Sequence, residues 1–118
     1  MKEIDDCRVI KILNEFNIIV NKGRIDGIND FQRFLVYELG EQIVDPKTGR
    51  ILGTLEIIKG RLKPIHIQEN MTTAESDEYS TEKSQKLASY STFVENKIQK
   101  PLNKGIKIGD FVKIISIV

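Results

Sequence analysis

The chain has 118 residues, of which 40% are hydrophobic and 30% are charged, and its formal net charge is +1 at pH 7. This length predicts one compact domain that can fold without a metal or a disulfide. The near-neutral charge argues against a dedicated nucleic-acid-binding protein and against an acidic disordered chain. Cys7 is the only cysteine and His66 the only histidine, which excludes an intrachain disulfide and a multi-cysteine or multi-histidine metal site.

The N-terminal stretch MKEIDDCRVIKIL carries acidic residues where a signal peptide needs a basic patch and then a long apolar run. No apolar run approaches the roughly 20 residues that a membrane-spanning helix requires. For a complete chain, these features predict a cytoplasmic protein with no membrane partner. For a piece cut from a longer protein, the location stays open. We expect no cofactor and no bound metal.

The first part of the chain is rich in β-branched residues. Residues 7–13 and 16–23 predict the two strands of a hairpin, joined by the short polar turn Asn-Glu. The next stretch, NKGRIDGIND, is rich in Gly, Asn and Asp, which favour turns. Residues 31–40 then predict a third strand, with Phe34 and Val36 on one face.

The middle of the chain predicts a second hairpin. Residues 41–44 read as a short strand, and the sequence DPKTG after them is typical of a tight turn between paired strands. Residues 50–58 predict the next strand, in which Gly53 indicates a bulge or a sharp bend. A further turn is predicted at residues 59–61.

The last third of the chain differs in character. Residues 62–70 alternate as a strand does, and Pro64 predicts that this strand lies at a sheet edge or is bulged there. Residues 72–105 are polar and serine-rich, which predicts a long insertion with a short helix around residues 81–90. Residues 107–118 predict the closing strand, which is a second candidate edge.

Together these elements amount to six or seven strands with tight turns. Successive strands lie too close in sequence for helical crossovers, so the sheet is expected to be mostly antiparallel. The predicted fold is all-β: residues 1–118 form one small, six- to seven-stranded antiparallel barrel, with a long polar insertion at residues 72–105 before the last strand.

The turn residues also resemble those of a known family. The stretches NKGRIDGIND, DPKTGRILGT and IGDFVKI are similar to the small β-barrel domain at the C-terminus of flagellar assembly protein T and to related bacterial barrel domains. The similarity covers residues 7–76 and 107–118, and Phe31 stands where the family usually has glycine. The resemblance implies a six-stranded barrel without catalytic residues. It carries over no flagellar role. The shared positions are Gly23, Asp26, Gly27, Phe34, Val36, Tyr37, Asp45, Pro46, Thr48, Gly49, Leu52, Gly53, Ala74, Gly109, Asp110 and Val112.

Four features invite a chemical interpretation. DPKTGR lacks the order and the following helix of a phosphate-binding P-loop, and NKGRIDGIND lacks the spacing of a calcium loop. His66 could act as a general base, and Cys7 as a nucleophile only if folding brought the two together. The sequence shows no partner for either, so we expect structural roles and no enzymatic activity.

Nucleic-acid binding is the alternative function. Small barrels bind single strands through a basic groove with stacking aromatics, and Tyr37, Phe31 and Phe34 could form such a platform. The net charge and the low aromatic content argue against it. We therefore expect a non-enzymatic interaction or assembly module that binds an unknown protein or a second copy of itself. The insertion would supply the contact through Tyr90, Phe93 and Val94.

Overall fold

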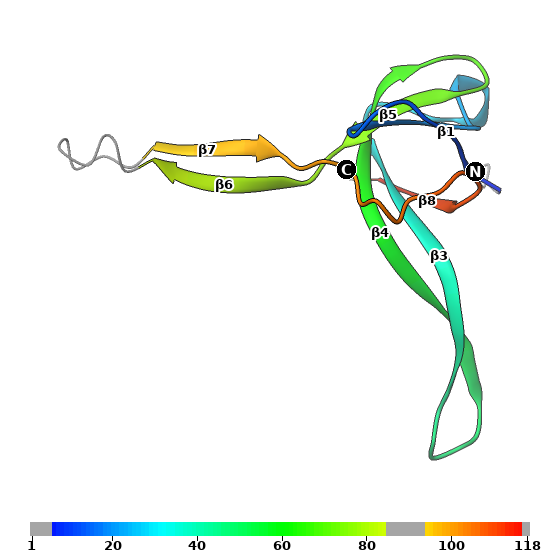
Figure 1. Ribbon diagram of the computed structural model, residues 1–118. Helices are drawn as coiled ribbons and strands as arrows, with labels where there is room; N and C mark the ends of the chain where they lie inside the picture. Colours follow the sequence, from blue (N-terminus) through cyan, green and yellow to red (C-terminus); the bar gives the residue numbers. More distant parts are fainter. Residues whose placement is uncertain (1–5, 85–93, 117–118) are drawn as a thin grey trace.

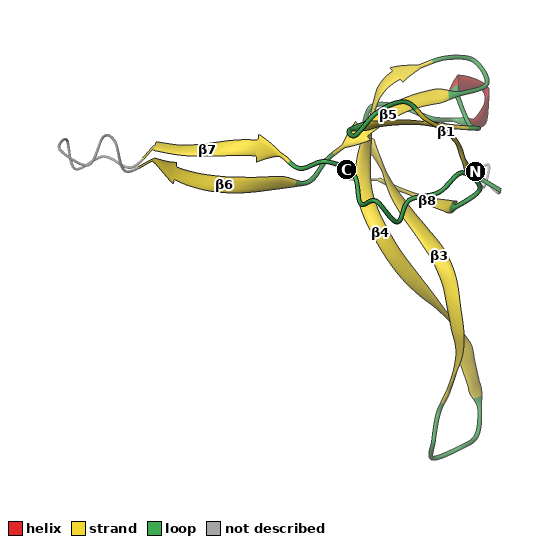
Figure 2. Ribbon diagram, viewed as in Figure 1, coloured by secondary structure: helices red, strands yellow, loops and turns green. Residues whose placement is uncertain are grey.

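The computed structural model of the protein describes residues 6–84 and 94–116. Within these ranges the chain forms β-strands and one short 3₁₀ helix (Figures 1 and 2). The elements, in chain order, are β1 (Val9–Ile12), β2 (Asn17–Val20), η1 (Arg24–Asp26), β3 (Gln32–Val44), β4 (Ile51–Ile67), β5 (Thr72–Ser76), β6 (Tyr79–Ser84), β7 (Val94–Gln99) and β8 (Phe111–Ser116). The predicted all-β class is confirmed.

Six strands form one antiparallel sheet in the order β1-β2-β5-β4-β3-β8. The remaining two, β6 and β7, pair only with each other and form a separate hairpin. Two strands are much longer than the rest. As a result, β3 and β4 extend together far beyond the body of the sheet (Figure 1).

The two outer strands of the sheet approach each other. Arg8, just before β1, forms an isolated antiparallel bridge with Phe111 of β8. Three backbone hydrogen bonds connect the same segments: Val9 N–H donates to Asp110 O at 3.0 Å, Gly109 N–H to Val9 O at 2.7 Å, and Val112 N–H to Cys7 O at 2.9 Å. The sheet therefore curves enough for its first and last strands to make contact.

The core lies inside this curved sheet. Phe34 and Val36 are fully buried, which confirms the predicted inward face of β3. Their neighbours on adjacent strands alternate in the same way, as a pleated sheet with one buried face requires. The buried apolar residues are Cys7, Val9, Ile18, Val20, Ile28, Phe34, Val36, Leu62, Ala74, Ile106 and Val112.

Several predicted turns are confirmed. The Asn14 side chain accepts hydrogen bonds from the N–H groups of Phe16 and Asn17, which builds the first hairpin turn. In the DPKTG turn, Asp45 Oδ1 accepts from Lys47 N–H at 2.8 Å, and Gly49 adopts φ 72°. These are the local side-chain bonds and the left-handed glycine that such turns use.

The predicted turn at residues 59–61 is wrong, because β4 runs through it without a break. Gly60 pairs with Val36 in the ladder, and Ile106 packs beside it. A Cβ at Gly60 would lie 3.4 Å from the Ile106 side chain. That distance is an ordinary van der Waals contact, so the strand could accept a small side chain at this position. Likewise, the two strands predicted at residues 31–40 and 41–44 are one strand, β3, which begins at Gln32.

The predicted bends within strands are confirmed at two positions. Gly53 has φ 147° and lies at a register shift between β3 and β4. Pro64 precedes a register shift between β4 and β5, so the predicted bulge is present. The alternative of an edge strand at Pro64 is wrong, since β4 lies between β3 and β5. The closing strand β8 does end the sheet, as predicted.

The predicted insertion at residues 72–105 needs two corrections. Its first five residues form β5, which lies between β2 and β4, and Thr72, Ala74 and Ser76 are fully buried. The polar residues tolerate this burial because they are bonded; Thr72 Oγ1 donates to Lys22 O at 2.7 Å. The predicted helix at residues 81–90 is wrong over 81–84, which belong to β6. Residues 85–90 lie outside the described ranges.

Candidate protein-interaction surface

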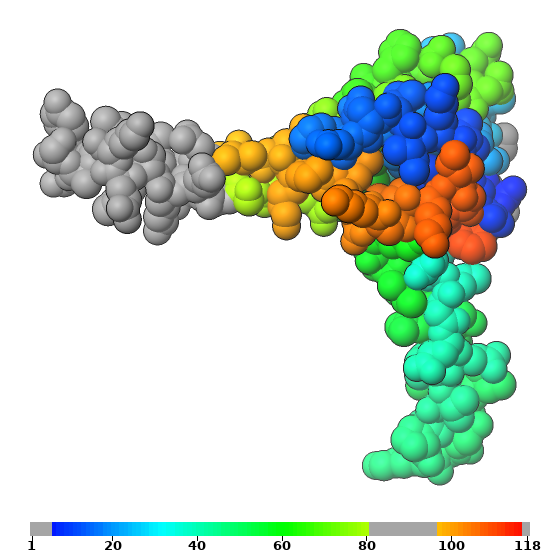
Figure 3. Space-filling model, viewed as in Figure 1, coloured from blue at the N-terminus to red at the C-terminus, as the bar shows by residue number. Residues whose placement is uncertain are grey.

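Two β-hairpins project from the body of the protein (Figures 1 and 3). The long arm comprises residues 38–58, the parts of β3 and β4 beyond the core, with the DPKTG turn at its tip. In this arm β3 has passed the end of its pairing with β8 at Tyr37, and β4 has not yet begun its pairing with β5 at Leu62. The short arm is the β6–β7 hairpin. The molecule therefore extends over 60 × 46 × 28 Å.

The long arm is held together by cross-strand pairing and by its turn. Glu38 pairs with Ile57, Leu39 with Glu56, and the register then shifts before Gln42. At the tip, Asp45 N–H donates to Arg50 O at 2.8 Å and closes the turn. Two-stranded ribbons are marginally stable alone, so the continuous connection to the core sheet is what supports the arm.

Apolar side chains dominate the surface of the long arm. Seven of them are between 41% and 61% exposed, and together they offer on the order of 400 Å² of apolar surface at about 60 Å² each. Because successive residues of a strand point to opposite faces, this surface is divided between the two faces of the arm. The seven residues are Leu39, Val44, Ile51, Leu52, Leu55, Ile57 and Ile58.

One face of the arm is shaped by a glycine. A Cβ at Gly40 would lie 3.0 Å from the Ile57 side chain and 3.5 Å from the Leu55 Cβ, so these residues share one face. The Ile57 side chain therefore occupies the space beside Gly40 that a larger residue's side chain would enter.

A buried lysine ties the base of the long arm to the end of the sheet. Lys59 Nζ donates to Asp110 Oδ2 and to Gly105 O, both at 2.8 Å, and lies 3.3 Å from Glu38 Oε2. Its side chain is only 8% exposed. Burial lowers the pKa of Lys59, but the hydrogen bonds to Asp110 and Glu38 outweigh burial and raise its pKa above the ordinary value. The lysine is therefore charged and links β4 to the segment before β8.

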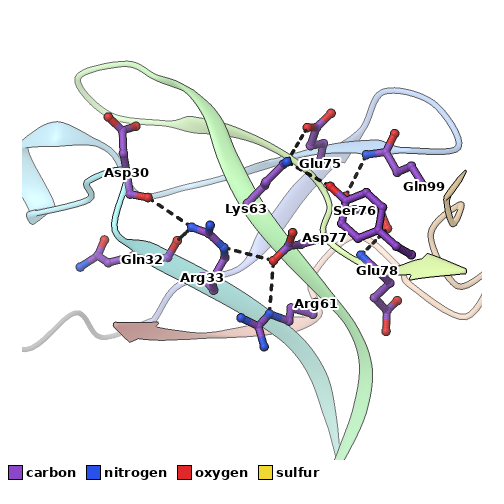
Figure 4. Close-up of polar contacts among 11 residues, drawn as sticks. Asp30, Gln32, Arg33, Arg61, Lys63, Glu75, Ser76, Asp77, Glu78 and Gln99 are labelled. Carbon is purple, nitrogen blue, oxygen red and sulfur yellow. Dashed lines mark hydrogen bonds and ion pairs between the residues drawn. The ribbon is translucent and has the colours of Figure 1, made fainter. Parts of the chain in front are cut away.

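A second polar cluster ties the base of the short arm to the body (Figure 4). Asp77, which leads into β6, accepts a hydrogen bond from Arg33 Nε at 3.1 Å and lies 3.4 Å from Arg61 Nε. Gln99, which ends β7, donates from Nε2 to Ser76 O at 2.8 Å. Both strands of the short arm are thus bonded to the body where they leave it.

Of the predicted contact residues, only Val94 lies in a described element. Val94 begins β7, but its side chain lies outside the described part of the chain. Tyr90 and Phe93 also lie outside the described ranges. Their role in partner contact stays a prediction. Of the side chains described on the short arm, Tyr79 and Ile98 are each 43% exposed.

The two residues considered for catalysis have different surroundings. Cys7 is buried in the core, and burial raises the pKa of its thiol to about 12. A thiol held in its protonated form is a poor nucleophile. His66 is exposed on β4 opposite Thr73. Within residues 6–84 and 94–116, no three His, Cys, Asp or Glu side chains gather where a metal ion could bind.

The predicted aromatic platform is not assembled. Phe34 is fully buried in the core, whereas Phe31 is 64% exposed. Tyr37 stacks on Phe111 with ring centroids 5.5 Å apart, and Arg8 lies 3.9 Å over the Phe111 ring. The three predicted rings therefore have three different environments and do not form one stacking platform.

An apolar pocket of about 600 Å³ lies where the first hairpin turn meets the segment after β7. Ile12 and Leu13 form one wall, and Leu102 and Ile106 form the other. His66 is not among its lining residues. Glu15 and Lys104 also line the pocket, but neither residue considered for catalysis does.

The comparisons with known proteins give no family. No family model matches the chain, and no curated protein matches it. The resemblance to the barrel domain of flagellar assembly protein T stays a prediction. Among the described residues, no helix is long and apolar enough to span a bilayer.

The sequence reasoning missed the long arm, although a signal was present. The stretch ILGTLEII, residues 51–58, holds one charged residue among eight. A strand that packs on one core face would alternate apolar and polar residues, as residues 62–70 do. The nearly continuous apolar run at residues 51–58 departs from that alternation, and this departure is the signal that distinguishes the outer part of β4.

Proposed function

We propose that the protein is a non-enzymatic interaction or assembly module that binds another protein chain through its projecting long arm. The observation that carries this proposal is the set of seven half-exposed apolar side chains on residues 38–58. Water-exposed apolar surface is costly, and its burial against a partner would release that cost. A cytoplasmic location belongs to the same proposal and stays a prediction.

The body from which the arms project is part of the proposal. We take the six-stranded sheet to be a small barrel, supported by the hydrogen bonds between residues 7–9 and β8. Barrels remove the open edges that would otherwise pair without control. In this arrangement the barrel supplies stability, and the arms, which keep open edges, supply the contacts.

A photo-crosslinking amino acid placed at Leu52 tests this function. Leu52 is the most exposed of the seven apolar residues at 61%, so the probe changes no buried contact. Irradiation of living cells that make the protein natively is expected to give a covalent adduct with a protein chain. The same probe at Ile108, which is 67% exposed on the body, is the matched control. Equal adducts at both positions, or none at Leu52, would contradict the proposal.

A further inference from the structure

Within residues 6–84 and 94–116, the outer part of β4 has one edge that pairs with no other strand. Residues 51–58 pair with β3 on one side, and β5 reaches β4 only from Leu62 onward. The outer part of β3, residues 38–44, is open in the same way because β8 pairs no farther than Tyr37. A row of unpaired backbone N–H and C=O groups is a ready template for another strand.

The two open edges differ in their protection. Residues 38–44 of β3 carry two carboxylates, Glu38 and Glu41. Residues 51–58 of β4 carry only Glu56, whose carboxylate is paired with Lys113 of the same chain, and they contain no proline. Natural edge strands are usually blunted by charges or proline. The β4 edge lacks this protection, whereas the β3 edge has it.

From this asymmetry we infer that the outer edge of β4 pairs, antiparallel, with the same edge of a second copy. The two arms would then form one four-stranded ribbon around a two-fold axis. This inference rests on the proposed function and names its partner. When the β4 edges of two copies pair with each other, both edges are used and the assembly closes at two copies. If β4 of one copy paired with the β3 edge of another, each copy would keep one unused edge and further copies could add to the assembly.

Charge also favours this arrangement. Pairing between β4 and β4 brings one carboxylate from each copy to the seam. Any register that offsets the two Glu56 residues avoids like charges directly opposite each other. Pairing between β4 and a neighbouring β3 would add Glu38 and Glu41 to the seam. The outer edge of β4 carries the fewest charges, so it is expected to pair with the same edge of a second copy.

The size of the contact sets its expected strength. Five exposed apolar residues flank the β4 edge, and at about 60 Å² each they would bury on the order of 600 Å² of apolar surface over two copies. Backbone groups and the arm faces add to this area. Stable dimers usually bury about 1,200–2,000 Å². We therefore expect a dimer that dissociates on dilution, with a micromolar dissociation constant. The five residues are Ile51, Leu52, Leu55, Ile57 and Ile58.

Analytical ultracentrifugation of the full chain, from about 1 μM to about 500 μM, tests the inference against the micromolar range expected for such an area. A concentration-dependent shift from monomer to dimer is expected, without larger species. Thr54 and Gln42 offer a matched pair because they are cross-strand partners and both exposed. Thr54→Lys, on the β4 edge, should weaken the dimer at least tenfold, and Gln42→Lys, on the β3 edge, should leave it unchanged.

A cysteine scan checks the symmetry. Single cysteines at each of residues 51–58 are oxidised at a concentration where the dimer forms; Cys7 can stay because it is buried. A residue on the two-fold axis lies about 5 Å from its mate. One step along the strand offsets the two mates by about 7 Å along the strand direction, so their Cα atoms are then about 8 Å apart. Since disulfides need Cα atoms within about 7 Å, only one or two cysteines should cross-link. The same scan over residues 38–44 should give none.

Three results would overturn the inference. These are a monomer at every concentration, a dimer that Thr54→Lys leaves intact, and cross-linking spread evenly over both strands of the arm. A monomer that still forms adducts with another protein from Leu52 would refute the second copy as partner and leave the proposed function standing. A monomer without adducts would refute both.

Discussion

Replacing Lys59 with methionine should destabilise the protein by about 3 kcal/mol, the cost typical of breaking a buried charge pair. Lys59 Nζ bonds to Asp110 and to Gly105 O at 2.8 Å each, and only 8% of the side chain is exposed. Methionine keeps the apolar stem but removes the charge. It leaves the Asp110 carboxylate, 11% exposed, with the Lys107 N–H as its remaining hydrogen-bond donor.

The magnitude follows from two losses. A hydrogen bond from a charged donor contributes about 1.5–3 kcal/mol, and Gly105 O loses such a donor. A carboxylate left largely buried without its cation adds about 1–3 kcal/mol. Lys113 is the matched control. It also pairs with a glutamate, Glu56, but its side chain is 45% exposed, so Lys113→Met should cost less than about 1 kcal/mol.

Urea denaturation of four proteins measures the effect: the parent, Lys59→Met, Asp110→Asn and the double variant. Because the two residues contact each other, the double variant should be at least 1 kcal/mol more stable than additivity of the single changes predicts. Two results would refute the view that Lys59 connects the long arm to the end of the sheet. One is that the stability changes of the two single variants add up in the double variant. The other is that Lys59→Met lowers the free energy of unfolding no more than Lys113→Met does.

The same pair predicts a dependence on pH. The pKa of Lys59 is raised above 10.5 in the folded protein, because its hydrogen bonds outweigh the effect of burial. As pH rises, the unfolded chain therefore releases this proton first. The stabilisation from Lys59 is fully present below about pH 10.5 and is lost as pH rises through the folded pKa. Lys59→Met should show a shallower loss of stability in this range, and an unchanged slope would contradict the assignment.

Three further predictions concern the core. Gly23→Ala places a Cβ 2.3 Å from Gln68 O, so it should destabilise the protein by several kcal/mol or prevent folding. Gly60→Ala is the matched control, because its Cβ meets the nearest atom at 3.4 Å and should cost under about 1 kcal/mol. Thermal denaturation measures both changes. Cys7 should react with a thiol reagent at pH 8 only as fast as the protein opens, since its thiol is buried with a pKa near 12; immediate reaction would contradict its place in the core. Phe34→Ala should cost about 3–5 kcal/mol in urea denaturation, and a loss below 1 kcal/mol would show that Phe34 is not the centre of the core.

Local chemistry made much of the fold predictable. The DPKTG turn, the bulge at Gly53 and the inward face of Phe34 each depend on a few neighbouring residues, so their sequence signals are direct. Gly60 misled the prediction because strand pairing overrides the turn preference of glycine at this position. Gly60 pairs with Val36 inside β4, and no local pattern reports that pairing.

The candidate surface was harder to predict for two physical reasons. Polarity suggested that residues 72–76 leave the fold, yet Thr72 is buried because its hydroxyl bonds to Lys22 O. Residues 51–58 predicted a strand, but the prediction did not place that strand on a projecting arm. In both cases the environment of a side chain depends on which strands pair, and strand pairing is set by the whole chain.

The contact between residues 7–9 and β8 also bears on how the chain folds. Arg8 and Gly109 meet although they are 101 residues apart. Closing a loop of about 100 residues instead of a turn of about five costs roughly 2.5 kcal/mol more in chain entropy, at about 0.6 kcal/mol per doubling. The β3–β4 hairpin pays only the smaller cost, so we expect it to lie in the folding nucleus. The joining of first and last strands would then follow as a late step, after the arm that carries the contact surface has already formed.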